Sequence, residues 1–211
     1  MLSVSILGIK ENIEENIKKL DKLGVDYFHI DIMDGLFVSN TTWKYGEIGP
    51  LVSDVNTKLD IHLMVNDVKR YVDDFVNLKP DFITFHYEAC DDVFGMINYV
   101  KDYGVKVGLS IKPGTLVSEI EPFLPFVDLV LVMSVEPGSG GQPFILSMCD
   151  KINELYEIRQ RGNFSYLIEV DGGINNITKE NVGSADILVV GSYITNNDYE
   201  EKINEFKKHR N

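Results

Sequence analysis

The chain has 211 residues, 44% hydrophobic and 25% charged, proportions that are ordinary for a soluble globular protein. Its net charge of −13 argues against nucleic acid or an anionic membrane as a partner, and implies that any bound phosphate is held by local backbone N–H groups. The length suits one domain of the α/β-barrel size, residues 1–211, or two small ones.

Targeting signals and cysteines point to a cytoplasmic protein. The segment Met1–Gly8 has no basic region or cleavage site, so we expect no signal peptide, and no apolar run is long enough to span a bilayer. Cys90 and Cys149 lack the spacing of metal or redox motifs, which is typical of a reducing compartment.

Short apolar runs alternate with amphipathic stretches along the whole chain. Helical spacing is predicted over about Glu11–Leu23, around Val68–Phe75 and Val93–Val100, and from Tyr199 to about Lys208. The segment from Trp43 to Val55 reads as looser. The predicted strands are Leu2–Leu7, Tyr27–Met33, Leu59–Val65, Asp81–His86, Val105–Ile111, Val127–Ser134, Tyr166–Asp171 and Asp186–Gly191.

These predicted strands are nearly continuous apolar runs separated by helical segments, which indicates a parallel sheet covered by helices. A single (β/α)8 TIM barrel is the direct solution, and an open doubly wound sheet is the alternative. In a barrel, polar residues at the carboxyl ends of strands gather at one mouth, where the active site belongs.

His29 and Asp31 share one face of the second strand, because side chains alternate along a strand. One interpretation is a satisfied core histidine beside an aspartate. The other is a metal site, since a barrel would bring His62 of the third strand and Asp171 of the seventh to the same mouth. Two imidazoles and two carboxylates suit one divalent ion such as zinc, iron, cobalt or manganese.

Glycines mark the ends of the last three strands. Gly140-Gly141 follow the sixth strand, Gly172-Gly173 the seventh and Gly191-Ser192 the eighth. Each pair alone reads as an ordinary turn, but glycine permits close backbone approach, and successive N–H groups can cradle an anion. Because a barrel's usual phosphate site lies in the loops after strands seven and eight, the three together indicate phosphate binding.

Two motifs, His29-Ile30-Asp31-Ile32-Met33-Asp34-Gly35 and Val170-Asp171-Gly172-Gly173, are highly specific in combination. Further motifs occur in order: Ser5-Ile6-Leu7, Asp60-Ile61-His62-Leu63-Met64-Val65, Phe85-His86-Tyr87-Glu88-Ala89, Ile111-Lys112-Pro113-Gly114-Thr115 and Val132-Met133-Ser134-Val135-Glu136-Pro137-Gly138. Together they resemble the ribulose-phosphate 3-epimerase family from about Ser5 to Ser192.

The resemblance implies a phosphate-binding barrel of the ribulose-phosphate type that interconverts D-ribulose 5-phosphate and D-xylulose 5-phosphate. It implies acid/base roles for Asp31 and Asp171, and one divalent ion held by His29, Asp31, His62 and Asp171. The expected partner is a small sugar phosphate, and we also expect a homo-oligomer. The implied substrate-binding residues are Ser5, His62, Met33, Met64, Met133, Gly140, Gly141, Gly172, Gly173, Gly191 and Ser192.

Inversion at C3 removes a proton from one face of the carbon and returns one to the other, so two carboxylates must flank it. A carboxylate is a weak base for a carbon acid, and a metal ion lessens the mismatch by stabilising the enediolate charge. This chemistry needs neither a lysine Schiff base nor an organic cofactor.

Ser139 stands where the family commonly has an aromatic residue, in a loop that we expect to close over the substrate. A hexulose 6-phosphate 3-epimerase, such as one acting on allulose 6-phosphate, is therefore an alternative. A sugar-phosphate binding protein without turnover is an alternative of another class. A decarboxylase of the related barrels would need an Asp-x-Lys-x-x-Asp array, and Asp31-Ile32-Met33-Asp34 contains no lysine.

Overall fold

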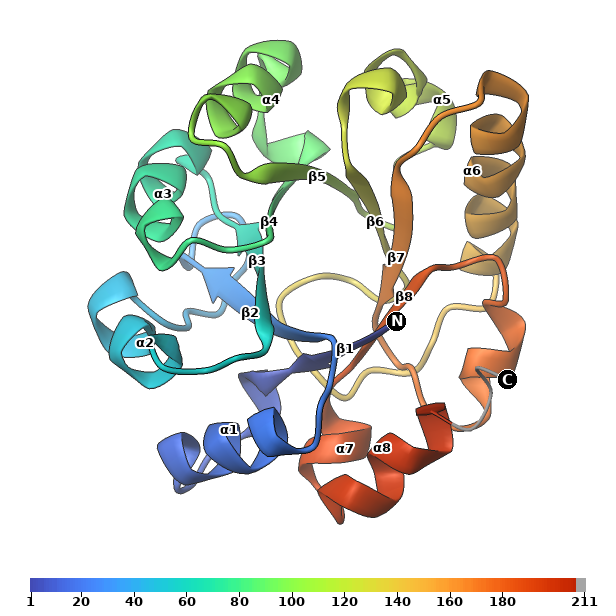
Figure 1. Cartoon of the computed structure of the whole chain (residues 1–211). Helices are drawn as coiled ribbons and strands as arrows, with labels where there is room; N and C mark the ends of the chain where they lie inside the picture. The colour runs from blue at the N-terminus through green and yellow to red at the C-terminus, as the bar shows by residue number, and fades with distance from the viewer. Residues whose placement is uncertain (208–211) are drawn as a thin grey trace.

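Figure 1 shows parallel strands closed into a barrel with helices around the outside. The strands are Leu2–Ser5 (β1), Tyr27–Met33 (β2), Lys58–Met64 (β3), Phe82–His86 (β4), Lys106–Ile111 (β5), Leu129–Met133 (β6), Leu167–Asp171 (β7) and Ile187–Val190 (β8). In this computed structural model, which describes residues 1–207, each strand pairs with its sequence neighbours and β8 pairs with β1. The predicted (β/α)8 barrel is confirmed.

The helices lie outside the barrel and cover the strands. They are Ile13–Lys22 (α1), Tyr45–Val52 (α2), Val68–Phe75 (α3), Val93–Asp102 (α4), Val117–Ile120 (α5), Met148–Gly162 (α6), Ser192–Thr195 (α7) and Tyr199–Lys207 (α8). The connection from β7 to β8 has a short 3-10 turn, Thr178–Asn181, in place of a helix. The predicted last helix is present, and its expected end at Lys208 lies outside the described residues.

The prediction that the segment from Trp43 to Val55 is loose is wrong, because it contains α2. Two glycines and Pro50 weaken the local preference for a helix. The Glu47 side chain nevertheless accepts the backbone N–H of Lys44 at 2.8 Å, which caps the first turn. Ile48 is fully buried against the core, so tertiary packing overrides the weak local propensity.

The register of the strands determines which polar side chains meet inside the barrel. In the pairing of β2 with β3, His29 lies opposite Asp60, and Asp31 lies opposite His62. These polar residues therefore stack in layers toward the carboxyl ends of the strands. The opposite end is closed by apolar side chains from the first residues of four alternate strands, namely Tyr27, Phe82, Leu129 and Ile187.

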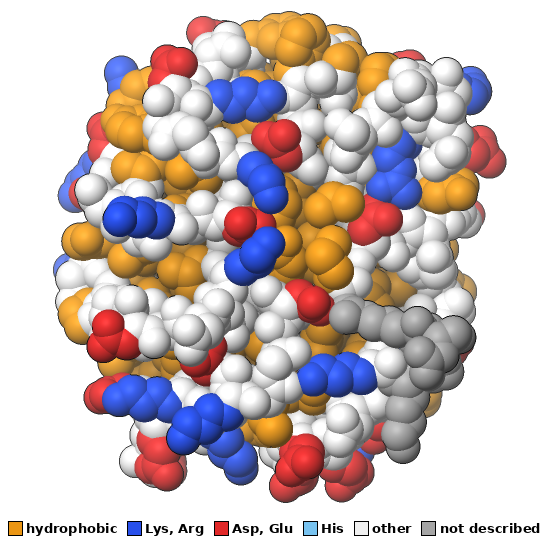
Figure 2. All heavy atoms as spheres, viewed as in Figure 1, with side chains coloured by type: hydrophobic (Ala, Val, Ile, Leu, Met, Phe, Trp, Pro, Cys, Tyr) orange, Lys and Arg blue, Asp and Glu red, His pale blue; other side chains and the backbone are white. Residues whose placement is uncertain are grey.

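The surface carries charge of both signs. On the face shown in Figure 2, acidic and basic side chains are interspersed, so the negative net charge is not gathered into one patch there. Within residues 1–207, none of the helices has the length and apolar character needed to cross a bilayer.

Candidate active site

Four donor side chains converge toward the carboxyl end of the barrel. His29 and Asp31 come from β2, His62 from β3 and Asp171 from β7, and one ligand-type atom of each lies within 4.8 Å of all the others. Both imidazoles are fully buried, and Asp31 is 3% exposed. The structure thus brings together the four residues that the sequence predicted as metal ligands.

The spacing of these atoms fits one divalent ion. Bonds of about 2.0–2.1 Å in a tetrahedral site place neighbouring ligand atoms about 3.4 Å apart. His29 Nε2 lies 3.3 Å from His62 Nδ1 and 3.4 Å from Asp31 Oδ1. Asp31 Oδ1 is 3.2 Å from His62 Nδ1, and Asp171 Oδ2 is 3.9 Å from His29 Nε2. Imidazole and carboxylate are also the donors that zinc and iron accept, so the set fits such an ion.

Each imidazole has a further partner on its other ring nitrogen. His29 Nδ1 lies 2.6 Å from Asp60 Oδ2, and His62 Nε2 lies 2.9 Å from His86 Nε2. His86 Nδ1 in turn lies 3.2 Å from Glu88 Oε2. Burial lowers the pKa of His86 to about 4, so this third ring is neutral at pH 7. Such partners orient ligand rings and select their tautomers.

The two aspartates of the cluster differ in proton affinity. Burial opposes ionisation of Asp31, but the charge of His29 and hydrogen bonds from both imidazoles lower the Asp31 pKa below its usual range. Burial, followed by the charge of Asp31, raises the pKa of Asp171 to about 6. Burial, followed by the charge of Asp60, also raises the pKa of Glu169 well above its usual range. Opposite shifts in neighbouring carboxyl groups are typical of acid/base sites.

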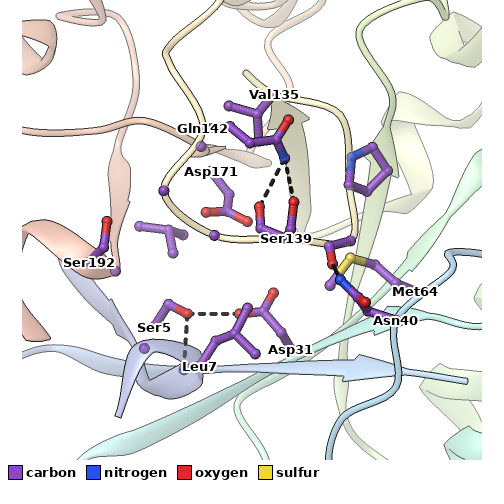
Figure 3. Close-up of a pocket in the computed structure, with 18 of the residues that line it drawn as sticks. Ser5, Leu7, Asp31, Asn40, Met64, Val135, Ser139, Gln142, Asp171 and Ser192 are labelled. Carbon is purple, nitrogen blue, oxygen red and sulfur yellow. Dashed lines mark hydrogen bonds between the residues drawn. The ribbon is translucent and has the colours of Figure 1, made fainter. Parts of the chain in front are cut away.

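A cavity of about 490 Å³ lies against this cluster. Asp31 and Asp171 line it, and Figure 3 shows Ser5 Oγ donating to Asp31 Oδ2, at 2.8 Å. Among the described residues, its only other charged wall groups are Glu136 and one cation, Lys10. His62 is buried in the cluster behind the wall. The remaining predicted substrate-binding residues that line the cavity are Met33, Met64, Met133, Gly140, Gly141, Gly172, Gly173, Gly191 and Ser192.

Two glycines are required by the turn after β7. Gly172 and Gly173 have φ angles of +122° and +65°, a region that disfavours other residues. A Cβ atom on Gly172 would lie 2.6 Å from Val135 Cγ2, and one on Gly173 would lie 2.5 Å from the backbone nitrogen of Phe144. The missing side chains leave this backbone open to the cavity, where its N–H groups are available to an anion.

Two loops meet at the cavity. Asn40 Nδ2, in the loop after β2, donates to the carbonyl oxygen of Gly138, in the loop after β6, at 2.7 Å. A Cβ atom on Gly138 would lie 2.9 Å from Val38 Cβ, so the two backbones approach closely. Gln142 Nε2 donates to the carbonyl oxygen of Ser139 at 2.9 Å and to its hydroxyl at 3.2 Å (Figure 3). Ser139 is therefore bonded within its own loop.

Three residues around the cluster received no role from the sequence, namely Asp60, His86 and Glu88. All three lie in the motifs quoted above, and Asp60 shares a strand face with His62. A polar residue two positions before a candidate ligand was the available signal. Which ring nitrogen each residue approaches depends on the packing of adjacent strands, and one sequence does not contain that information.

The fold and this site define a (β/α)8-barrel enzyme with a candidate metal centre at the carboxyl ends of its strands. Residues 1–195 match the model of the "Ribulose-phosphate 3 epimerase family". The chain belongs to this family.

Curated relatives agree with the family match. The ribulose-phosphate 3-epimerase of Treponema pallidum (strain Nichols) is 41% identical over 175 residues, which cover 82% of this chain and 80% of that protein. The ribulose-phosphate 3-epimerase of Bacillus subtilis (strain 168) is 41% identical over 186 residues, covering 84% and 83%. The structure of KGPDC from Streptococcus mutans in complex with ribose 5-phosphate has a TM-score of 0.67, 12% identity and coverage of 98% and 95%, which shows a shared fold alone.

Proposed function

We propose that the protein epimerises a ketose phosphate at C3 and interconverts D-ribulose 5-phosphate and D-xylulose 5-phosphate. The observation that carries this proposal is the pair Asp31 and Asp171, which line one cavity from β2 and β7 beside two buried imidazoles. The family match and the names of the T. pallidum and B. subtilis relatives support the same reaction.

His29, Asp31, His62 and Asp171 would hold one divalent ion, such as zinc, iron, cobalt or manganese, and the proposal includes no organic cofactor. When bound, the ion supplies positive charge that stabilises the negative charge developing on the sugar oxygens. The buried imidazoles keep their place because each bonds to a further side chain, His29 to Asp60 and His62 to His86.

Asp31 and Asp171 form the acid/base pair in this proposal. Inversion needs one group to remove the C3 proton and a second group to return a proton to the opposite face. The Ser5 hydroxyl orients the Asp31 carboxylate by donating to it. Ser134 holds the backbone of Asp171, because its N–H and hydroxyl donate to the Asp171 carbonyl oxygen at 2.7 and 2.9 Å. Both bases are thereby fixed before substrate enters.

The remaining cavity residues divide between the two ends of the substrate. Backbone N–H groups near Gly140-Gly141, Gly172-Gly173 and Gly191-Ser192 bind the phosphate, consistent with a chain of net negative charge. Ser5, His62 and the methionines Met33, Met64 and Met133 lie toward the sugar. The ribose 5-phosphate complex of the S. mutans barrel supports a sugar phosphate as the ligand.

Isotope exchange tests the two-base assignment. Asp31→Asn and Asp171→Asn should each abolish epimerisation, and each should spare exchange of the C3 proton with solvent for only one epimer, because one base survives. Deuterium incorporation is measured separately into ribulose 5-phosphate and xylulose 5-phosphate. Metal content is measured on each variant, since both changes remove a ligand charge, and the exposed Asp91→Asn serves as the control of equal charge change.

Near-normal turnover in both metal-loaded variants would refute the two-base mechanism. Loss of all exchange in one variant and none in the other would do the same. Either outcome would favour a one-base mechanism or a binding protein without turnover.

A hexulose 6-phosphate is a second candidate substrate. Ser139 is exposed and bonded within its loop, so no large side chain at this position limits the length of the sugar. Turnover compared on ribulose 5-phosphate and allulose 6-phosphate distinguishes the two. Cytoplasmic location and homo-oligomeric assembly, both expected from the sequence, belong to the same proposal and are tested by cell fractionation and light scattering.

A further inference from the structure

We infer that His86 and Glu88 are positioning residues that fix the tautomer of His62 and so raise the affinity of the donor cluster for a divalent ion. The inference rests on the metal site of the proposed function. Neither residue lines the cavity within the described chain, so both would act through His62 alone.

A continuous row of polar contacts runs from the cluster to the loop after β4. His62 on β3 has Nδ1 in the cluster and Nε2 at 2.9 Å from His86 Nε2 on β4. His86 Nδ1 lies 3.2 Å from Glu88 Oε2, directly after β4. The two rings are fully buried, with their centroids 5.0 Å apart and their planes inclined by 31°. The row is therefore shielded from water up to the carboxylate.

The hydrogen count along this row permits one arrangement. Each neutral imidazole carries one N–H. If the lone pair of His62 Nδ1 faces the cluster, the hydrogen on Nε2 is donated to His86 Nε2. The hydrogen of His86 is then on Nδ1, where the Glu88 carboxylate accepts it. In the reverse arrangement the lone pair of His86 Nδ1 would face the carboxylate, and two acceptors would oppose each other in a buried site.

Glu88 is itself held as a carboxylate by the neighbouring loop. Glu88 Oε1 accepts the backbone N–H of Lys112 at 2.7 Å and the hydroxyl of Thr115. Hydrogen bonds from His86, Thr115 and Lys112 outweigh burial and lower the pKa of Glu88 to about 2. The buried ammonium group of Lys151 on α6 fixes the loop, because it donates to the Thr115 carbonyl oxygen at 2.6 Å and to the Lys112 carbonyl oxygen at 3.0 Å.

Phe37 holds the middle ring in place from the loop after β2. Its ring centroid lies 4.8 Å from that of His86. The Lys112 ammonium group stands 3.8 Å from the centroid of the same Phe37 ring. His86 thus packs against both His62 and Phe37, which limits rotation of the imidazole.

Imidazole nitrogen NMR on the unmodified protein reads the tautomers directly. With the histidines labelled with nitrogen-15, we expect His86 to carry its hydrogen on Nδ1 and His62 on Nε2, before and after addition of zinc. A His86 ring protonated on Nε2 alone would overturn the inference without any variant.

Zinc affinity then measures the effect. Glu88→Gln leaves one amide oxygen to serve His86 on one side and Lys112 with Thr115 on the other, so one side loses its acceptor. We expect the zinc dissociation constant, from competition with a chromophoric chelator, to rise about 10- to 100-fold. Thr115→Val removes one donor to Glu88 and should raise the constant by a smaller factor, which keeps the test valid if Glu88→Gln folds poorly.

Glu157→Gln, on the exposed face of α6, removes the same charge and should leave the zinc constant unchanged. Equal constants for wild type and Glu88→Gln, the same rise in Glu157→Gln, or a wild type that binds no zinc would each overturn the inference. Both readouts are independent of turnover. An inactive protein whose zinc affinity depends on Glu88 would refute the proposed reaction alone, and an active protein with Glu88-independent affinity would refute the positioning role alone.

Discussion

Replacing Gly172 with alanine should destabilise the barrel strongly. A side chain at a φ of +122° costs about 1–3 kcal/mol, because this backbone region is nearly restricted to glycine. The added Cβ atom would also lie 2.6 and 2.8 Å from the two Val135 methyl groups, and overpacking of this kind costs about 1–3 kcal/mol. We expect the free energy of unfolding to fall by about 2–6 kcal/mol, out of about 5–15 kcal/mol for a typical domain.

A double-mutant cycle separates the two contributions. Val135→Ala alone should cost about 1–2 kcal/mol for the lost apolar burial. In the Gly172→Ala background it removes the clashing methyl groups, so the packing part, about 1–3 kcal/mol, should appear as coupling. The backbone part remains, because φ is unchanged and Val135 N still lies 2.9 Å from the added atom.

Urea unfolding at unchanged m-value is the assay. Gly183→Ala is the control, because a Cβ atom there meets nothing within 4 Å. The reasoning is refuted if Gly172→Ala falls within about 0.5 kcal/mol of wild type, the range of ordinary surface changes, or if the cycle shows no coupling.

Two further predictions concern the metal and the phosphate. A chelator should remove about one divalent ion per chain together with activity, and zinc or cobalt should restore both; a fully active preparation shown by elemental analysis to be free of metal would contradict this. Lys10→Met should raise KM for ribulose 5-phosphate about 3- to 10-fold with little change in kcat, because it removes the one cation among the described wall residues. Lys101→Met on α4 is the control of equal charge change, and an equal rise in both variants would contradict a specific role.

The strands could be predicted because each is an apolar run that ends at a turn signal, as Tyr27–Met33 does at Gly35. Their closure into a barrel also followed from the alternation with helices. Helix α2 could not be predicted in the same way. Its glycines and Pro50 oppose a helix locally, and only the burial of Ile48 against distant residues stabilises it.

The four candidate ligands were predictable because their residue types are unusual on buried strands, and the structure brings them together. The partners of their outer nitrogens were not. The contact between His29 and Asp60 depends on the register of β2 against β3, and that between His62 and His86 depends on ring orientation in neighbouring strands. Both are properties of packing between strands and leave no periodic signal in the chain.

The hydrogen bond from Asn40 to the carbonyl oxygen of Gly138 has a consequence for the rate of exchange at the cavity. It is a single exposed bond between two loops, and such a bond contributes about 0.5–1.5 kcal/mol net. Thermal motion breaks a contact of this strength readily within the microsecond-to-millisecond times of loop movement. The loops can therefore separate in each turnover without unfolding either one. Product departure past this bridge then requires no slow rearrangement of the barrel.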